Sequence, residues 1–151
     1  MRRADREITD RAAMDDLLRR HQVLYLALPD ESAPYVIPIT YGYDGECLYL
    51  HCAAEGRKID LMKAHPQVAF AIEAEYTVKP GDVACGWGFD YASVVGEGTA
   101  EIIEDHDEKK HGLDVLMRHF TPEPQTYRDG GIEGTTVIRV RITALSGKTN
   151  T

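Results

Sequence analysis

Residues 35–58 have the sequence YVIPITYGYDGECLYLHCAAEGRK, and this segment decides the fold. Residues 35–43 and 46–52 are rich in β-branched and aromatic residues, and the turn signal Asp44-Gly45 between them predicts a β-hairpin. Pro38 cannot donate a hydrogen bond to a β-ladder, so we expect a bulge or an edge position in the first strand. Good helix formers follow over residues 57–65 and stop before Pro66, which predicts a helix directly after the hairpin.

The elements on either side of this segment indicate a mainly β chain with a few helices. Thr9 or Asp10 can cap a first helix, and Asp105 begins a capping box for a later one. Gly96 and Gly98 are expected bulge points in one long or bent strand. Strands are expected over residues 23–28, 68–75, 91–104 and 135–143. Five or six strands joined mostly by turns, with two or three helices, predict a small antiparallel barrel with helices packed outside.

The composition excludes several classes of protein. Of 151 residues 43% are hydrophobic and 28% charged, and no apolar run approaches the roughly 18 residues that cross a bilayer. We therefore expect one globular domain over residues 1–151 with no membrane association. The net charge of −8 repels polyanions and argues against nucleic acid as a partner. Cysteines without a C-x-x-C pair and an N-terminus without an apolar signal segment favour the cytoplasm.

The strand end and helix start at residues 51–58 have the chemistry of an anion pocket. Small residues allow a backbone to approach closely, and the free N–H groups and dipole of the helix attract negative charge that Arg57 and Lys58 can neutralise. The alternative is that both cations are simply solvated. Basic residues at a helix start are disfavoured by roughly 0.3–1 kcal/mol each, however, and a bound anion would explain them.

The aromatic candidates each have a structural alternative. Tyr35, Tyr41 and Tyr43 alternate on one side of a strand, where aromatic side chains pack more often than they contact a ligand. Trp87 lies in a glycine-rich loop, where it can wall a pocket or plug a barrel end.

His51 ends the second hairpin strand, and alternation places it on the face opposite the leucines of that strand. Cys47 and Tyr49 share the face of His51, and we expect one of the two faces to be core and the other not. A histidine at a strand end is usually structural, so its residue type alone does not assign it a function. The remaining histidines have no carboxylates at ligand spacing, and no metal site is expected.

A set of short motifs runs through nearly the whole chain. The motifs are Arg2-Arg3 with Asp5-Arg6-Glu7-Ile8, Pro34-Tyr35-Val36-Ile37-Pro38-Ile39 with Tyr41-Gly42, Leu48-Tyr49-Leu50-His51, Glu55-Gly56-Arg57-Lys58, Pro80-Gly81-Asp82, Cys85 with Trp87, Tyr91-Ala92-Ser93-Val94-Val95-Gly96-Glu97-Gly98, Gly112-Leu113 and Met117-Arg118-His119-Phe120. Each is weak alone, but the ordered set is specific. It resembles the 5-nitroimidazole-resistance (Nim) branch of the pyridoxamine 5′-phosphate oxidase-like split β-barrel superfamily, whose members bind a flavin nucleotide.

The resemblance implies an antiparallel split β-barrel of the FMN-binding type, mainly β with flanking helices, that forms a homodimer with FMN at the interface. The FMN phosphate would lie over Gly56-Arg57-Lys58, and the edge of the ring would follow residues 38–41. Cys52 stands where relatives often carry serine, so a main-chain contact to the phosphate is implied and a side-chain contact is in doubt. The implied cofactor-binding residues are Tyr35, Val36, Pro38, Ile39, Thr40, Tyr41, His51, Cys52, Ala53, Gly56, Arg57, Lys58 and Trp87.

The resemblance also implies a nitroreductase-like oxidoreductase, which passes electrons from a small-molecule donor to an acceptor such as a 5-nitroimidazole. FMN would carry that chemistry, with His51 as the candidate catalytic residue, either a proton source or the group that orients the acceptor. The chain has no Gly-x-Gly-x-x-Gly fingerprint, so a reduced nicotinamide would bind only transiently. It also lacks the Arg-rich C-terminal substrate segment of pyridoxamine-phosphate oxidase, whose activity is not expected. The alternatives are a non-enzymatic flavin carrier or sensor and a barrel that binds haem or a deazaflavin.

Overall fold

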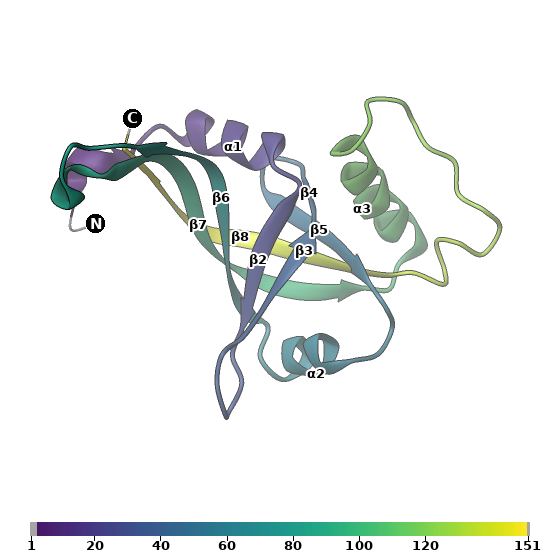
Figure 1. Cartoon of the computed structure of the whole chain (residues 1–151). Helices are drawn as coiled ribbons and strands as arrows, with labels where there is room; N and C mark the ends of the chain where they lie inside the picture. The colour runs from purple at the N-terminus through teal and green to yellow at the C-terminus, as the bar shows by residue number, and fades with distance from the viewer. Residues whose placement is uncertain (1–2, 151) are drawn as a thin grey trace.

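The computed structural model describes residues 3–150, which fold around one antiparallel β-sheet (Figure 1). The strand order is β3-β2-β6-β7-β8-β5-β4, and the short β1 pairs with β8. Arg2, in the first motif, lies outside the described residues. The strands are β1 (Glu7–Ile8), β2 (Val23–Leu28), β3 (Tyr35–Thr40), β4 (Gly42–Tyr43), β5 (Cys47–Cys52), β6 (Gln67–Lys79), β7 (Gly88–Ile103) and β8 (Thr136–Thr149).

Helices flank the sheet, as the sequence predicted. Within residues 3–150 the α-helices are α1 (Arg11–Arg20), α2 (Arg57–Ala64) and α3 (His106–Arg118), and short 3-10 turns occur at Ala4–Arg6 and Ala84–Gly86. The mainly β fold with helices packed outside is therefore confirmed. None of the helices in the described part of the chain is long and apolar enough to cross a membrane.

One stretch of chain closes the sheet into a barrel that stays split on one side. β3 pairs with β2 from Val23↔Thr40 to Leu28↔Tyr35, and β4 pairs with β5. Only Tyr41 separates β3 from β4, so the two ends of the strand order are joined covalently at that residue. The other edge of β3 has no ladder partner among the described strands, which leaves the barrel split between β3 and β5.

The main core lies inside the barrel, and α1 packs against it. Met14, Leu17 and Leu18 of α1 are buried in the same core cluster as the leucines of β2 and β5. Tyr41 is completely buried there, and its hydroxyl donates a 2.7 Å hydrogen bond to the carbonyl of Leu18. The Asp10 side chain accepts the N–H of Ala12 at 3.0 Å, so the predicted cap of α1 is present.

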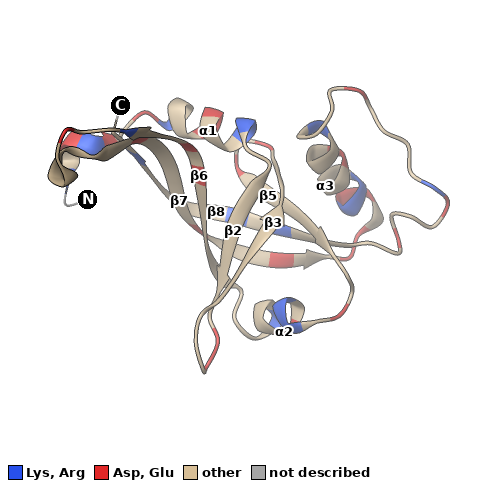
Figure 2. Ribbon diagram, in the orientation of Figure 1, with Lys and Arg blue, Asp and Glu red and all other residues tan. Residues whose placement is uncertain are grey.

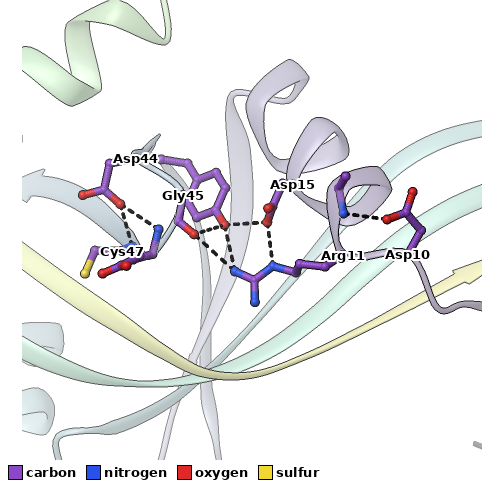
Figure 3. A network of polar contacts seen from close by, with 9 residues as sticks. Asp10, Arg11, Asp15, Asp44, Gly45 and Cys47 are labelled. Carbon is purple, nitrogen blue, oxygen red and sulfur yellow. Dashed lines mark hydrogen bonds and ion pairs between the residues drawn. The ribbon is translucent and has the colours of Figure 1, made fainter.

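A polar network fixes α1 to the turn between β4 and β5 (Figure 3). Arg11 contacts the Asp15 carboxylate at 2.8 Å and donates to the Gly45 carbonyl at 3.2 Å. The Tyr43 hydroxyl lies 2.6 Å from Asp15 and 2.7 Å from the Gly45 carbonyl, and with one proton it donates to one of them at a time. Burial and the Asp15 hydrogen bond together raise the pKa of Tyr43 to about 12. The Asp44-Gly45 turn is present, but the predicted hairpin is wrong for most of its first strand. Only Gly42 and Tyr43 pair with β5 across the turn, whereas residues 35–40 pair with β2.

Strands β6, β7 and β8 extend beyond their predicted ends. The expected end of the last strand at residue 143 is wrong, because β8 continues to Thr149. A bulge explains the error: Glu97 pairs with Ala144 but Gly98 pairs with Ile142, so Thr143 is left out of the ladder. The apolar alternation of β8 therefore resumes one residue out of phase and is hard to detect in the sequence. The register shift lies beside Gly98, where a bulge was expected, although the extra residue belongs to β8. The bulge expected at Gly96 is wrong, because the ladder is regular there.

A second, smaller core lies between α3 and the outer face of β5. Cys47 and Tyr49 are buried there with Leu113. Gly112 permits this approach, since a Cβ at that position would lie 2.7 Å from the Tyr49 ring. The expectation that only one face of β5 is core is therefore wrong for Cys47 and Tyr49, because α3 covers both. It holds for His51, which is exposed beyond the covered region.

Candidate functional site

The start of α2 presents N–H groups that nothing in the described chain occupies. Gly56 precedes the helix with a φ of 129°, a conformation that favours glycine, and a Cβ there would meet no atom within 4 Å. The Gly56 carbonyl accepts the N–H groups of Ile59 and Asp60, but no side chain caps the helix. Within residues 3–150, the N–H groups of Arg57 and Lys58 have no acceptor. This arrangement is typical of an anion-binding helix start.

Arg57 is tied to the loop between β2 and β3. Its Nη2 and Nε lie 2.6 and 3.2 Å from Oδ2 of Asp30, and its guanidinium carbon lies 4.5 Å from the centroid of the Tyr35 ring. The hydrogen bond from Arg57 lowers the pKa of Asp30, so the carboxylate stays charged and balances the guanidinium. Arg57 therefore holds α2 beside the end of β3 and has less charge to offer a ligand than the sequence indicated.

Lys58 is the cation that remains beside the helix start. It is half-buried and has no hydrogen bond or ion pair with the other described residues. Burial raises the pKa of the Cys52 thiol, and the nearby charge of Lys58 partly offsets this rise. The end of β5 and the start of α2 therefore lie together, with the exposed Ala53 between them.

The edge of β3 that faces the split carries unpaired backbone groups. Tyr41 donates its N–H to the Gln22 carbonyl at 3.3 Å, so alternation along the ladder makes Tyr25↔Pro38 a non-hydrogen-bonded pair. The nitrogen of Pro38 thus faces the open edge, and the predicted edge position is confirmed. By the same alternation, the N–H and C=O groups of Val36 and Thr40 also face the split, where they can pair with the polar edge of a ligand.

The side chains of this strand divide into two sets. Val36, Pro38 and Thr40 alternate onto the outer surface of the barrel. Tyr35 and Ile39 instead pack against the main core. The Tyr41 side chain is wholly buried, as described above, so it belongs to the core and only its backbone lies near the split.

His51 lies on the β5 side of the split. It is exposed, with no hydrogen-bond partner in the described part of the chain, and it lies opposite the completely buried Leu50. The predicted orientation away from the leucine core is confirmed. Its chemical role stays a prediction.

Trp87 lies apart from all the other candidate residues within one chain. It belongs to the arm, which we define as residues 75–92 at the end of the β6–β7 hairpin. Figure 1 shows this end of the hairpin at the upper left and α2 at the bottom of the molecule. Trp87 is 57% exposed, so it does not plug the barrel.

Sequence reasoning missed two features of the surface. Asp30 is the first feature, because nothing local in the sequence links it to Arg57, which lies 27 residues away. The second feature is a pocket on the arm, where Tyr76, Phe89 and Tyr91 join Trp87. Tyr91 belongs to one of the motifs quoted above, which was the only signal for it.

The outer face of the barrel bears an apolar strip, which we define by the residues at the end of this paragraph. Pairing of Tyr25 with Ala71, and of Ala71 with Val95, places strands β2, β6 and β7 on this one face. Tyr25, Val36 and Val95 are each about half exposed, at 49%, 55% and 50%. Figure 2 shows β2 and β3 without charged residues. A solvated outer face would alternate to polar residues, so this strip indicates a contact surface. The strip consists of Val23, Tyr25, Ala27, Val36, Pro38, Ala69, Ala71 and Val95.

Fold and site together define a class: antiparallel split β-barrels with an uncapped helix start beside the split. Within that class, the chain belongs to the pyridoxamine 5′-phosphate oxidase family, whose sequence pattern it matches over residues 10–149. The superfamily inferred from the motifs is thereby confirmed.

Several known proteins are similar to this chain. The structure of a candidate 5-nitroimidazole antibiotic resistance protein from Bacteroides thetaiotaomicron is 28% identical, with a TM-score of 0.84 over 94% of this chain and 85% of that one. An FAD-binding protein from Mesorhizobium loti is 25% identical, with a TM-score of 0.69 over 97% and 98%. The FAD- and haem-binding protein of Mycobacterium smegmatis, 24% identical with a TM-score of 0.85 over 96% and 73%, shares the fold.

Among curated proteins, an uncharacterised protein of Rhizobium meliloti (strain 1021) is 29% identical over 112 residues. The match spans 72% of this chain and 64%, less than two thirds, of that protein.

Proposed function

We propose that this chain binds FMN at the split between β3 and β5 and works as a flavin-dependent reductase of small molecules, 5-nitroimidazoles among them. One observation carries the proposal: the edge of β3 without a ladder partner lies beside an uncapped helix start that also holds Lys58, which has no partner among the described residues. Such a site has an anion-binding end and a hydrogen-bonding edge, which are the two needs of a flavin mononucleotide.

The residues present fit that group. The N–H groups at the start of α2 and the ammonium of Lys58 would hold the phosphate, and Gly56 leaves open space above them. The backbone groups of Val36, Pro38 and Thr40 would pair with the polar edge of the ring system. When bound, FMN supplies the hydride and single-electron transfer that no side chain of this chain performs.

His51 is the residue to which we assign proton chemistry. Its imidazole lies on the outer surface at the end of β5, where a protonated ring nitrogen can donate its proton to an acceptor. The likeness to a candidate nitroimidazole resistance protein supports a nitro group as the acceptor. The electron donor is a reduced nicotinamide that binds transiently at the solvent-exposed side of the flavin site.

We further propose that the active form is a homodimer. The apolar strip carries the half-exposed side chains of Tyr25, Val36 and Val95, and twofold symmetry would bury it on both copies at once. The strip includes Val36 and Pro38, so a second copy seated there would also cover the split. In a dimer, the arm of one protomer could reach the flavin site of the other. Trp87 lies on the arm, and it therefore remains among the proposed cofactor-binding residues.

The test begins with the absorbance spectrum and light scattering of freshly purified protein. We expect a flavin spectrum, a mass twice the 16.9 kDa of the chain, and a much higher affinity for FMN than for riboflavin. Reduced nicotinamide should bleach the flavin without oxygen, and a 5-nitroimidazole should restore its colour. Equal affinities for FMN and riboflavin contradict the phosphate site. Bound FMN that no donor bleaches contradicts the reductase and favours a flavin carrier.

A further inference from the structure

The arm carries a pocket whose residues, Trp87 apart, the proposed flavin site does not use. Its volume is about 570 Å³. Tyr76 pairs with Tyr91 across the β6–β7 ladder, and Val78 pairs with Phe89, so these rings share one face of the arm with Trp87. The pocket is lined by Arg6, Glu73, Tyr76, Trp87, Gly88, Phe89, Tyr91 and Asn150.

Two cations converge on Tyr91. Nζ of Lys148 lies 5.6 Å from the centroid of the Tyr91 ring. Hydrogen bonds from Lys148 and Arg6 lower the pKa of Tyr91, so its surroundings favour negative charge although the whole chain carries −8. Neither cation has an ion-pair partner within residues 3–150. The acidic groups nearby are Glu73, which lines the pocket, Glu7, which faces Lys148 across the β1–β8 ladder, and Asp5, which interacts with Arg6. Asp5 is paired with Arg3 at 2.6 Å, so the charge of that pair is balanced.

The pocket walls are held in place by hydrogen bonds and an ion pair within the arm and to the end of β8. Asn150 donates its N–H to the Tyr91 carbonyl at 3.0 Å and its side-chain amide to the Phe89 carbonyl at 2.6 Å. Lys79 and Asp90 form an ion pair at 2.6 Å across the same hairpin. A ligand therefore meets aromatic walls whose backbone is already ordered, which reduces the entropic cost of binding.

We propose that this pocket binds a planar aromatic carboxylate. The ring would lie among Tyr76, Trp87 and Phe89, whose faces favour stacked or edge-on contact with another aromatic ring. The carboxylate would accept hydrogen bonds from the guanidinium of Arg6 and the hydroxyl of Tyr91, and arginine suits carboxylate geometry best among the cations. A cationic ring would be repelled by Arg6 and Lys148. The inference needs only this pocket and does not depend on a bound flavin.

The test is calorimetric titration of the full chain, as purified and without an electron donor, with 4-nitrobenzoate and with 4-nitrobenzamide. The two probes share one ring and differ in charge. We expect the acid to bind about tenfold tighter or better, which is the contribution of one charge-assisted hydrogen bond. Trp87 is the sole tryptophan, so its emission should fall as the acid binds, after correction with free N-acetyltryptophanamide.

Variants distinguish recognition of the carboxylate from recognition of the aromatic ring. Arg6→Met and Tyr91→Phe should each weaken the acid about tenfold and leave the amide unchanged. Trp87→Ala should weaken both probes alike, because stacking does not depend on the charge of the ligand. Lys63→Met removes the same unit of charge from the far end of α2, and we expect it to bind both probes as the parent does.

Three results overturn the inference: equal binding of acid and amide, no binding of either because another copy covers the arm, and full acid affinity in a folded Arg6→Met variant. Flavin content is read from the absorbance of the same samples. Flavin-free protein that binds the acid supports this inference and contradicts the flavin proposal. Protein that contains flavin but does not bind the acid contradicts this inference and supports the flavin proposal.

Discussion

Lys58→Ala and Arg57→Ala should affect FMN binding unequally, although the two cations are adjacent in the sequence. Lys58 is half-buried beside Cys52 and has no partner among residues 3–150, so its whole charge is available to a phosphate. Arg57 is already paired with Asp30 at 2.6 Å and lies over the Tyr35 ring. Removal of Lys58 therefore deletes a charge-assisted contact of roughly 1.5–3 kcal/mol, about ten- to a hundredfold in affinity.

Arg57→Ala should cost less FMN affinity, below about tenfold, because its charge is shared with Asp30. It should instead loosen the contact between α2 and the β2–β3 loop. The thermal midpoint of unfolding, measured without flavin, should therefore fall more for Arg57→Ala than for Lys58→Ala. An exposed ion pair contributes only about 0.2–1 kcal/mol, so we expect a shift of a few degrees.

The assay is quenching of flavin fluorescence as protein is titrated into FMN or riboflavin. Only FMN affinity should respond to Lys58→Ala, since riboflavin has no phosphate, and Lys63→Ala in the last turn of α2 is the matched control. The reasoning is refuted if Lys58→Ala weakens both ligands equally. It is also refuted if Arg57→Ala costs more FMN affinity than Lys58→Ala does.

Three further predictions concern the catalyst, the interface and acid stability. His51→Ala should keep FMN and lose most nitroimidazole turnover, measured under anaerobic conditions with a reduced nicotinamide; unchanged turnover would remove His51 from the chemistry. Val95→Glu should give monomers in light scattering, whereas Phe120→Glu, at an exposed apolar residue outside the apolar strip, should not. Tyr43→Phe should lower the free energy of unfolding by about 1 kcal/mol at pH 7. Burial alone would raise the pKa of Asp15, but hydrogen bonds from Tyr43 and Arg11 outweigh it and hold that pKa below the ordinary value. The Tyr43→Phe deficit in urea unfolding should therefore be full above about pH 4 and shrink as the pH falls through the lowered pKa, leaving the part due to the Gly45 carbonyl. A deficit of unchanged size at about pH 2 would contradict this role of Asp15.

The features that could be predicted from sequence are those fixed by neighbouring residues. The cap at Asp10, the turn at Asp44-Gly45 and the bulge beside Gly98 each depend on a few adjacent positions. Contacts between distant segments could not be predicted in this way. Cys47 and Tyr49 are covered by α3, and nothing in their own strand indicates that a helix packs on its outer face.

The same distinction between neighbouring and distant residues applies to the candidate site. The start of α2 combines small residues and cations in one short segment, so it was recognisable from the sequence. The arm pocket was not, because its rings come from two strands that continue past their predicted ends. The ion pair between Asp30 and Arg57 joins a loop to a helix, and only the fold brings them together.

Pro38 has a consequence for the solubility of the protein during expression. The free edge of β3 is a template on which a strand of another molecule could add, and a chain of such additions leads to aggregation. The nitrogen of Pro38 faces that edge and has no hydrogen to donate, so it interrupts the row of donors at its centre. Valine at this position would complete the row and raise the β-propensity of the segment. Pro38 therefore also hinders the strand-by-strand addition of other molecules at the split, which is the first step toward fibrous aggregates.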